Sequence, residues 1–193
     1  SSDKEKIITN CGALEKNTGN AAYLRYSAAH STIVLENTNI SEIRDNQPQI
    51  KFPQIVSLKK QEGRSKHIIE ASHNGYIKNY KKIIKRKIHF QEDENYLEGE
   101  DSIISATSKN REIIFHVRFH ILPNINITQT NSRRNVILKT KSNKIWLFKA
   151  NKDLVLEESV FMDKNDVKET KQIVIKGITK QNRERIQWSL SKK

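Results

Sequence analysis

The strongest constraint on the fold is an alternation of apolar and polar side chains with a period of two residues. From Ile113 to Ile121 the odd positions are apolar and most even positions are polar. Because successive side chains of a strand point to opposite faces, this pattern predicts a half-buried strand of an antiparallel sheet. The same rhythm predicts strands over residues 6–10, 31–36, 54–58, 67–71, 83–90, 124–128, 135–140, 144–149, 154–162, 172–178 and 185–190.

Polar clusters separate these runs, at residues 62–64, 92–95, 108–110, 141–143 and 163–166. Strands repeated every 8 to 12 residues or so, with turns between them, are typical of a β-sandwich or barrel. The nearest approach to a helical stripe is Tyr76 to Ile88, but its β-branched pairs favour a strand. We therefore predict an all-β fold: one antiparallel β-sandwich domain of two stacked, multi-stranded sheets over residues 1–193.

The longest stretch without a strand pattern is the polar segment from Asn37 to Phe52, which contains Pro48. A long connection in a sandwich with short loops is often functional. We expect it to form a loop at the rim of the domain.

The chain is strongly basic, with 35 Lys and Arg against 22 Asp and Glu and a net charge of +13. This charge favours a polyanion as partner, whether nucleic acid, acidic polysaccharide or membrane surface, although AT-rich codon usage would give a similar composition. The positive residues are dispersed and no nucleic-acid-binding motif accompanies them, so nucleic acid is the least favoured partner. No apolar run reaches the roughly 18 to 20 residues that a membrane span requires.

The single cysteine, Cys11, allows no internal disulfide and leaves the redox compartment open; we expect a buried, inert thiol. His116 and His120 lie on one face of a predicted strand, with Cβ atoms about 13 Å apart, too far to share a metal ion. With Arg118 they are expected to form a polar outer face.

His30 and His73 have small neighbours, which would let a bulky partner approach the imidazole. Ser27-Ala28-Ala29 precedes His30, and Asn74-Gly75 follows His73. On spacing alone, a structural role and a functional role both stay open for each of them.

Several stretches together resemble the C-terminal part of heparinase II/III-like proteins. The most specific are AAHST at 28–32, HNGY at 73–76 and LEGED at 97–101. The others are IITNCGA at 7–13, LRYSAAHSTIVLENTNISEI at 24–43, FHVRFHILPNI at 115–125, LEESVFM at 156–162 and KETKQIVIKG at 168–177. In order and spacing they cover nearly the whole chain.

The resemblance implies an antiparallel β-sandwich that follows an N-terminal α/α toroid, with a substrate cleft between the two domains. Characterised members are polysaccharide lyases that cleave uronate-containing chains by β-elimination. Their catalytic Tyr and part of the His set lie on the toroid. We accordingly expect this chain to be the C-terminal fragment of a larger protein, an intramolecular toroid to be absent from it, and an acidic polysaccharide to be the partner. Family habit suggests a bacterial cell envelope or periplasm, with the cytoplasm left open.

The resemblance also implies roles for individual residues. His30 falls on a histidine that ligates a structural zinc in family members that have the metal, and Arg25 matches the basic residue five positions before it. Asn10 stands where the family has a ligand Asp, and a neutral amide is a weak zinc ligand. The other zinc-binding His of the family would precede Ser1. Zinc is therefore a possibility for the full-length protein and is not expected in this chain alone.

His73 matches an H-D-G-Y turn of the family, with Asn74 in the Asp place. We expect this turn to shape the sandwich or its contact with the toroid. The catalytic candidates are His30, Arg25 and His73, and the substrate-binding candidates are Arg25, Tyr26, His73 and Tyr76. Two functions stay open: the sandwich part of a lyase, which alone would be inactive, or a non-catalytic carbohydrate-binding or assembly module.

Overall fold

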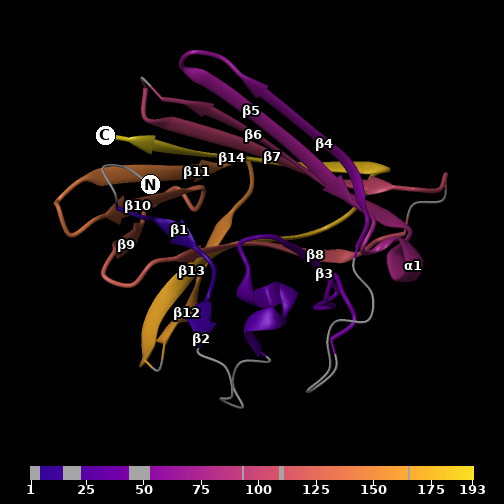
Figure 1. The fold of residues 1–193 in the computed structure, drawn as a ribbon, viewed down its shortest axis with the longest axis horizontal. Coiled ribbons are helices and arrows are strands. Elements are labelled where there is room, and N and C mark those ends of the chain that lie inside the picture. Colours follow the sequence, from indigo (N-terminus) through magenta and orange to yellow (C-terminus); the bar gives the residue numbers. More distant parts are fainter. Residues whose placement is uncertain (1–4, 15–22, 44–52, 93, 109–110, 165) are drawn as a thin grey trace.

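Two β-sheets face each other in the computed structural model (Figure 1), which describes residues 5–14, 23–43, 53–92, 94–108, 111–164 and 166–193. The eight-stranded sheet has the order β4 (Ile55–Glu62), β5 (Lys66–His73), β6 (Lys82–Gln91), β7 (Tyr96–Ser105), β14 (Arg183–Lys192), β11 (Ile145–Ala150), β10 (Asn135–Lys139) and β9 (Asn126–Gln129). The six-stranded sheet has the order β1 (Ile8–Thr9), β8 (Ile114–Ile121), β13 (Asp166–Ile178), β12 (Leu154–Lys164) and β2 (Gly12–Leu14), with β3 (Ile33–Leu35) also on β8.

Neighbouring strands are antiparallel except for the parallel pair of β12 and β2. These two sheets confirm the predicted all-β sandwich. No helix among the described ranges has the length and apolar character needed to cross a bilayer.

The core lies between the sheets and follows the predicted period of β8. The odd side chains from Phe115 to Ile121 are at most 1% exposed. The Phe119 ring reaches across to the eight-stranded sheet, where it lies 4.9 Å from the rings of both Phe148 and Trp188. Burial of several aromatic rings in one cluster supplies much of the hydrophobic stabilisation that holds the sheets together.

The segment predicted as a strand over residues 76–88 begins differently. One helical turn, α1 (Ile77–Tyr80), precedes β6 and ends at Lys81, whose backbone is left-handed with φ of 55°. The β-branched pairs that favoured a strand lie in β6, so the strand prediction is wrong only for the first turn.

The outer face of β8 also differs from expectation. His120 is 2% exposed, although we expected it to share a polar outer face with His116 and Arg118. The reason is that the residues around β2 and the 3-10 turn η2 (Ser27–Ala29) cross this face, and Cys11 and Ala28 contact the His120 ring. The six-stranded sheet is thus covered on both sides at this point.

Candidate functional site

Arg25 and His30 line one hollow at the rim of the sandwich. The turn η2 ends at His30, whose backbone is extended and whose amide donates to the Ser27 carbonyl at 3.2 Å. A hollow of about 300 Å³ opens beside it and is lined by Arg25, Ser27, His30, Thr32, Ile40 and Ser41. Arg25 is exposed and His30 half-buried, so both can meet a partner from outside.

A second hollow, of about 700 Å³, shares Ile40 and Ser41 with the first. It is lined by residues 38–43, Pro53, Gln54, Asn74, Gly75, Ile77, Lys78 and Asn79. The described part of the predicted rim loop therefore forms the wall between the two hollows, while its residues 44–52 lie outside the described ranges. We call the residues that line these two hollows the rim site.

The turn His73–Tyr76 packs against residues 38–40 of this wall. The His73 Nδ1 atom accepts a hydrogen bond from the Gly75 amide at 3.2 Å, and burial lowers the pKa of His73, which keeps the ring neutral. A Cβ on Gly75 would lie 2.6 Å from Ile40 Cγ2, so only glycine allows the turn to approach the wall this closely. His73 thus acts on the rim site through the position of the turn.

Tyr76 is 1% exposed, and its hydroxyl lies 3.0 Å from the Thr38 carbonyl and 3.4 Å from the Ile33 carbonyl. Burial raises the pKa of this phenol, so it stays a hydrogen-bond donor. A ring enclosed in this way does not touch a substrate in this conformation. Tyr76 thus holds residues 33–38 in place, and the substrate-binding role expected for it stays a prediction. Tyr26 is half-buried and packs edge-on against Tyr23, with ring centroids 5.7 Å apart.

Asn10 and the His30 segment lie side by side, as the resemblance implies. The Asn10 Oδ1 atom accepts a hydrogen bond from the Ser31 amide at 2.9 Å. Within the described ranges no group of three or more His, Cys, Asp or Glu side chains could hold a metal ion. Since a closed zinc site needs about four donors, these residues do not by themselves fit the metal.

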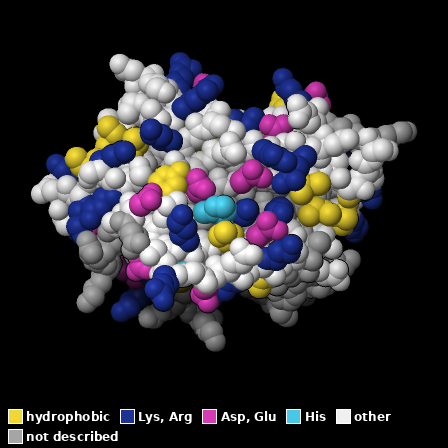
Figure 2. Space-filling model, turned by 90° about the horizontal axis from the view of Figure 1, so that it is seen from above, with side chains coloured by type: hydrophobic (Ala, Val, Ile, Leu, Met, Phe, Trp, Pro, Cys, Tyr) yellow, Lys and Arg dark blue, Asp and Glu magenta, His cyan; other side chains and the backbone are white. Residues whose placement is uncertain are grey.

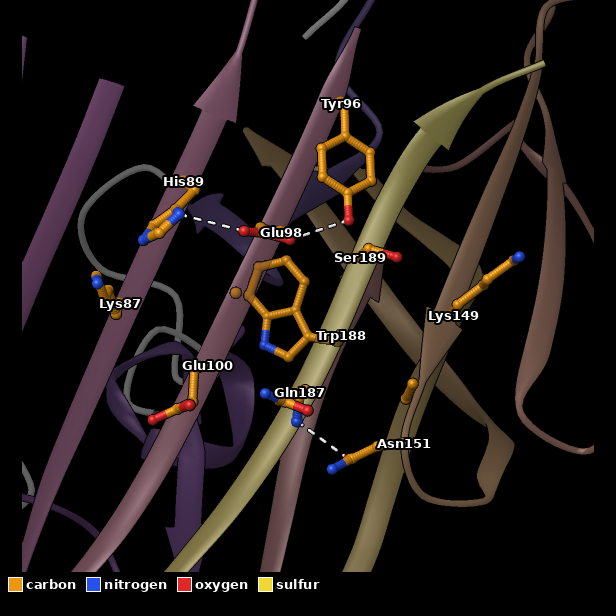
Figure 3. A pocket seen from close by; sticks show the side chains of 12 residues that line it. Lys87, His89, Tyr96, Glu98, Glu100, Lys149, Asn151, Gln187, Trp188 and Ser189 are labelled. Carbon is orange, nitrogen blue, oxygen red and sulfur yellow. Dashed lines mark hydrogen bonds and ion pairs between the residues drawn. The ribbon is translucent and has the colours of Figure 1, made fainter. Parts of the chain in front are cut away.

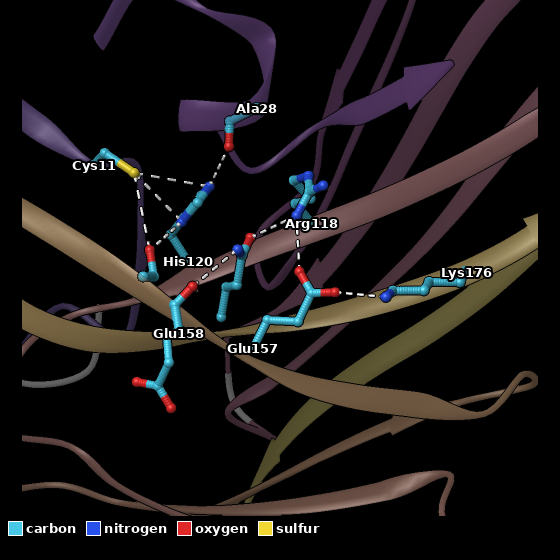
Figure 4. Close-up of polar contacts among 9 residues, drawn as sticks. Cys11, Ala28, Arg118, His120, Glu157, Glu158 and Lys176 are labelled. Atoms are coloured by element: carbon cyan, nitrogen blue, oxygen red, sulfur yellow. Dashed lines mark hydrogen bonds and ion pairs between the residues drawn. The ribbon is translucent and has the colours of Figure 1, made fainter. Parts of the chain in front are cut away.

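A neutral polar cluster lies beneath η2 (Figure 4). The Ala28 carbonyl can only accept, so His120 Nε2, 2.9 Å away, carries the proton, and Nδ1 accepts from the Ser159 hydroxyl at 2.8 Å. The Cys11 sulfur lies 3.5 Å from Nδ1. Burial lowers the pKa of His120 to about 4, so the imidazole is neutral at pH 7. Burial also raises the pKa of the Cys11 thiol, which therefore stays protonated. Sequence spacing gave no sign of this contact, because Cys11 and His120 are 109 positions apart.

A third hollow, of about 570 Å³, lies on the outer face of the eight-stranded sheet and is lined in part by Glu98, Gly99 and Glu100 of the LEGED motif. Figure 2 shows this face with both signs of charge interspersed around one histidine. Glu98 pairs with His89 at 3.2 Å and accepts from the Tyr96 hydroxyl at 3.0 Å, as Figure 3 shows. Glu100 pairs with Arg183 at 3.2 Å. We call this cavity, with the residues that line it, the outer-face hollow.

Comparison with known proteins identifies relatives of the whole sandwich. A model of the family described as "Heparinase II/III-like, C-terminal" matches residues 1–189. The heparan sulfate lyase HepC from Pedobacter heparinus superposes with a TM-score of 0.76 at 13% identity, over 96% of this chain and 28% of that one. A heparinase III superposes with a TM-score of 0.73 at 10% identity, over 97% of this chain and 28% of that one. No curated protein sequence matched the chain.

Proposed function

Because the chain belongs to the heparinase II/III-like C-terminal family, we propose that it is the β-sandwich part of a polysaccharide lyase-like protein acting on acidic, uronate-containing polysaccharide by β-elimination. The chain spans 28% of the length of the lyase structures it resembles. In this proposal most catalytic groups lie on an α/α toroid outside the chain. From family habit, we place the longer protein in the cell envelope or periplasm, which cell fractionation would test.

The observation that carries the proposal is the shared hollow of Arg25 and His30. Elimination removes the proton at C5 of the uronate and expels the O4 substituent, so a site must stabilise the carboxylate and move two protons. A guanidinium such as that of Arg25 is suited to a carboxylate because it can bind both oxygens at once. The half-buried imidazole of His30 has one ring nitrogen that can donate and one that can accept a hydrogen bond when neutral. The net charge of +13 agrees with an anionic substrate.

No step of this proposal depends on zinc. His30 and Asn10 are adjacent in space, but the amide oxygen of Asn10 already accepts a backbone hydrogen bond. This arrangement favours, as a second candidate, a module that retains glycan binding without catalysis.

The test is an assay of the full-length protein against a panel of uronate polysaccharides, following the absorbance of the unsaturated product. We expect turnover of at least one substrate, and its loss in His30→Ala while the sandwich stays folded by circular dichroism. Arg25→Ala should mainly weaken substrate binding. Glycan binding without product would favour the second candidate, and salt-dependent retention on DNA in place of either would favour a nucleic-acid partner.

A further inference from the structure

A cross-strand ion pair between β6 and β7 faces the core, and a further hydrogen bond connects it to the residue next to His30. Asp101 of β7 is 0% exposed, and its two carboxylate oxygens accept from Arg86 Nε at 2.6 Å and Nη2 at 2.9 Å. The Trp188 indole N–H donates to the same carboxylate at 2.9 Å. The Arg86 guanidinium also lies over the rings of Phe119 and Trp188, at 5.6 and 5.7 Å from their centroids. The charge of each partner is therefore compensated within the pair and its aromatic surroundings.

Arg86 makes a third hydrogen bond besides the two that it donates to Asp101. Arg86 Nη1 donates to the backbone carbonyl of Ser31 at 2.6 Å. Arg86 belongs to the eight-stranded sheet, whereas Ser31 leads into β3 of the six-stranded sheet. This bond thus connects the two sheets at the segment that carries His30.

Ser31 is fixed by its other polar groups as well. Its amide donates to Asn10 Oδ1 at 2.9 Å, its hydroxyl donates to the Thr9 carbonyl at 2.5 Å, and the His120 amide donates to that hydroxyl at 2.9 Å. The end of β1, strand β8 and strand β6 therefore all hold one residue. His30 immediately precedes it and follows the small residues Ser27, Ala28 and Ala29.

We infer that Arg86 and Asp101 are positioning residues, which fix the backbone at Ser31 from the opposite sheet and so set the direction of the His30 imidazole in the rim site. The functional meaning of this role rests on the proposed function, whereas the positioning itself is measurable without a glycan. A buried ion pair adds little net stability compared with well-packed apolar residues, which suits a pair whose contribution is geometry.

The test compares two variants with a matched control. In Arg86→Lys the ammonium can still pair with Asp101, but it lacks the fork that also reaches Ser31. In the double variant Arg86→Met with Asp101→Asn, both charges are removed while an acceptor for Trp188 remains. The control is Arg134→Lys. Arg134 forms an exposed ion pair with Asp153 at 3.3 Å, and this pair makes no contact with the hydrogen bonds described for Ser31.

Two readouts on the 193-residue chain separate positioning from general stability. Amide hydrogen exchange at Ser31 and His120 should become about tenfold faster in both variants, the effect of losing one charge-assisted hydrogen bond, while residues 126–139 of β9 and β10 keep their protection. Long-range ¹H–¹⁵N spectra should show the His30 ring resonances shifted and those of His67 unchanged. The control should match the parent chain in both.

Unchanged His30 resonances and unchanged exchange at Ser31 in a folded variant would overturn the inference. Failure of both variants to fold would overturn it too, because the pair would then be a requirement of the core as a whole. Since neither readout contains a glycan, a negative polysaccharide assay would count against the proposed function and leave this result standing.

Discussion

The rim site and the outer-face hollow use charge in opposite ways. The outer-face hollow, of about 570 Å³, lies in size between the two hollows of the rim site, of about 300 and 700 Å³, and it is rich in charged side chains. Those side chains pair with one another at the surface, as Glu98 does with His89. Beneath the rim site, by contrast, the Asp101 carboxylate is buried, and its half-buried partner Arg86 donates to the backbone of the His30 segment. The charges of the outer-face hollow are thus paired locally, whereas the Asp101 carboxylate is linked through Arg86 to the backbone of the proposed site.

The largest expected effect comes from removing the buried carboxylate. Asp101→Ala would leave the Arg86 charge without its carboxylate and the Trp188 N–H without its acceptor, which should lower the free energy of unfolding by about 3 to 5 kcal/mol. Denaturant unfolding measures this directly. The control Asp153→Ala removes the exposed partner of Arg134 and should change stability by less than about 0.5 kcal/mol. Equal effects would abolish the distinction between the two kinds of pair.

The next largest effect is a dependence of the free energy of unfolding on pH, caused by the buried His120 beneath the rim site. His120 has a pKa of about 4 in the folded chain, lowered by burial from the ordinary 6.5, so the unfolded chain binds more protons between these values. Stability is therefore fully present above about pH 6.5 and decreases as the pH falls towards 4, by on the order of 3 kcal/mol. Unfolding curves at pH 7 and pH 4.5 should differ more for the parent chain than for His120→Gln. An identical pH dependence in the two proteins would show that His120 does not titrate as described.

Two tyrosines allow a matched comparison of the regions. Tyr76→Phe removes a buried hydroxyl from the Thr38 and Ile33 carbonyls and should cost about 1 to 2 kcal/mol, because those acceptors are left without a donor. Tyr96→Phe removes a hydroxyl that serves Glu98 on the outer face, where water can replace it, and should cost less than about 0.5 kcal/mol. Thermal unfolding of both variants in the same buffer would check the order, and a larger loss for Tyr96→Phe would reverse it.

The smallest effect is expected for a surface ion pair on the outer face. Lys85 and Glu70 lie 2.8 Å apart, and the Lys85 hydrogen bond lowers the pKa of Glu70. A double-mutant cycle with alanine at both positions should give a coupling below about 1 kcal/mol that weakens further in high salt. A coupling as large as the loss in Asp101→Ala would mean that the outer face is also held by its charges.

The sequence predicts most of the strands because period-two alternation reports directly on burial, as in β8. It fails for β7, where Gly99 and Asp101 occupy inward positions that the pattern expects to be apolar. Both residues have a local reason: a Cβ on Gly99 would lie 2.2 Å from the Trp188 ring, and Asp101 holds Arg86. These reasons exist only once strands distant in sequence are paired, so alternation alone cannot supply them.

The sequence predicts only part of the candidate site, because some of its contacts join segments that are distant in sequence. The resemblance locates Arg25, His30 and Asn10, and the structure brings these segments together. The motif match predicts a substrate contact for Tyr76, whereas its burial follows from the packing of the turn, which no short motif encodes. The sequence predicts no site role for Arg86 and His120, because their contacts with Ser31 span 55 and 89 positions. An inward charge in an alternating strand, such as Arg86 in β6, is the one signal that could have drawn attention to the network.

We propose that the rim site, and not the outer-face hollow, meets the glycan. The most direct test is amide hydrogen exchange of the full-length protein with and without a heparan sulfate oligosaccharide. We predict slower exchange at residues 25–32 and 38–43, with residues 96–100 and 187–189 unchanged. Slower exchange confined to the outer-face hollow would contradict the claim.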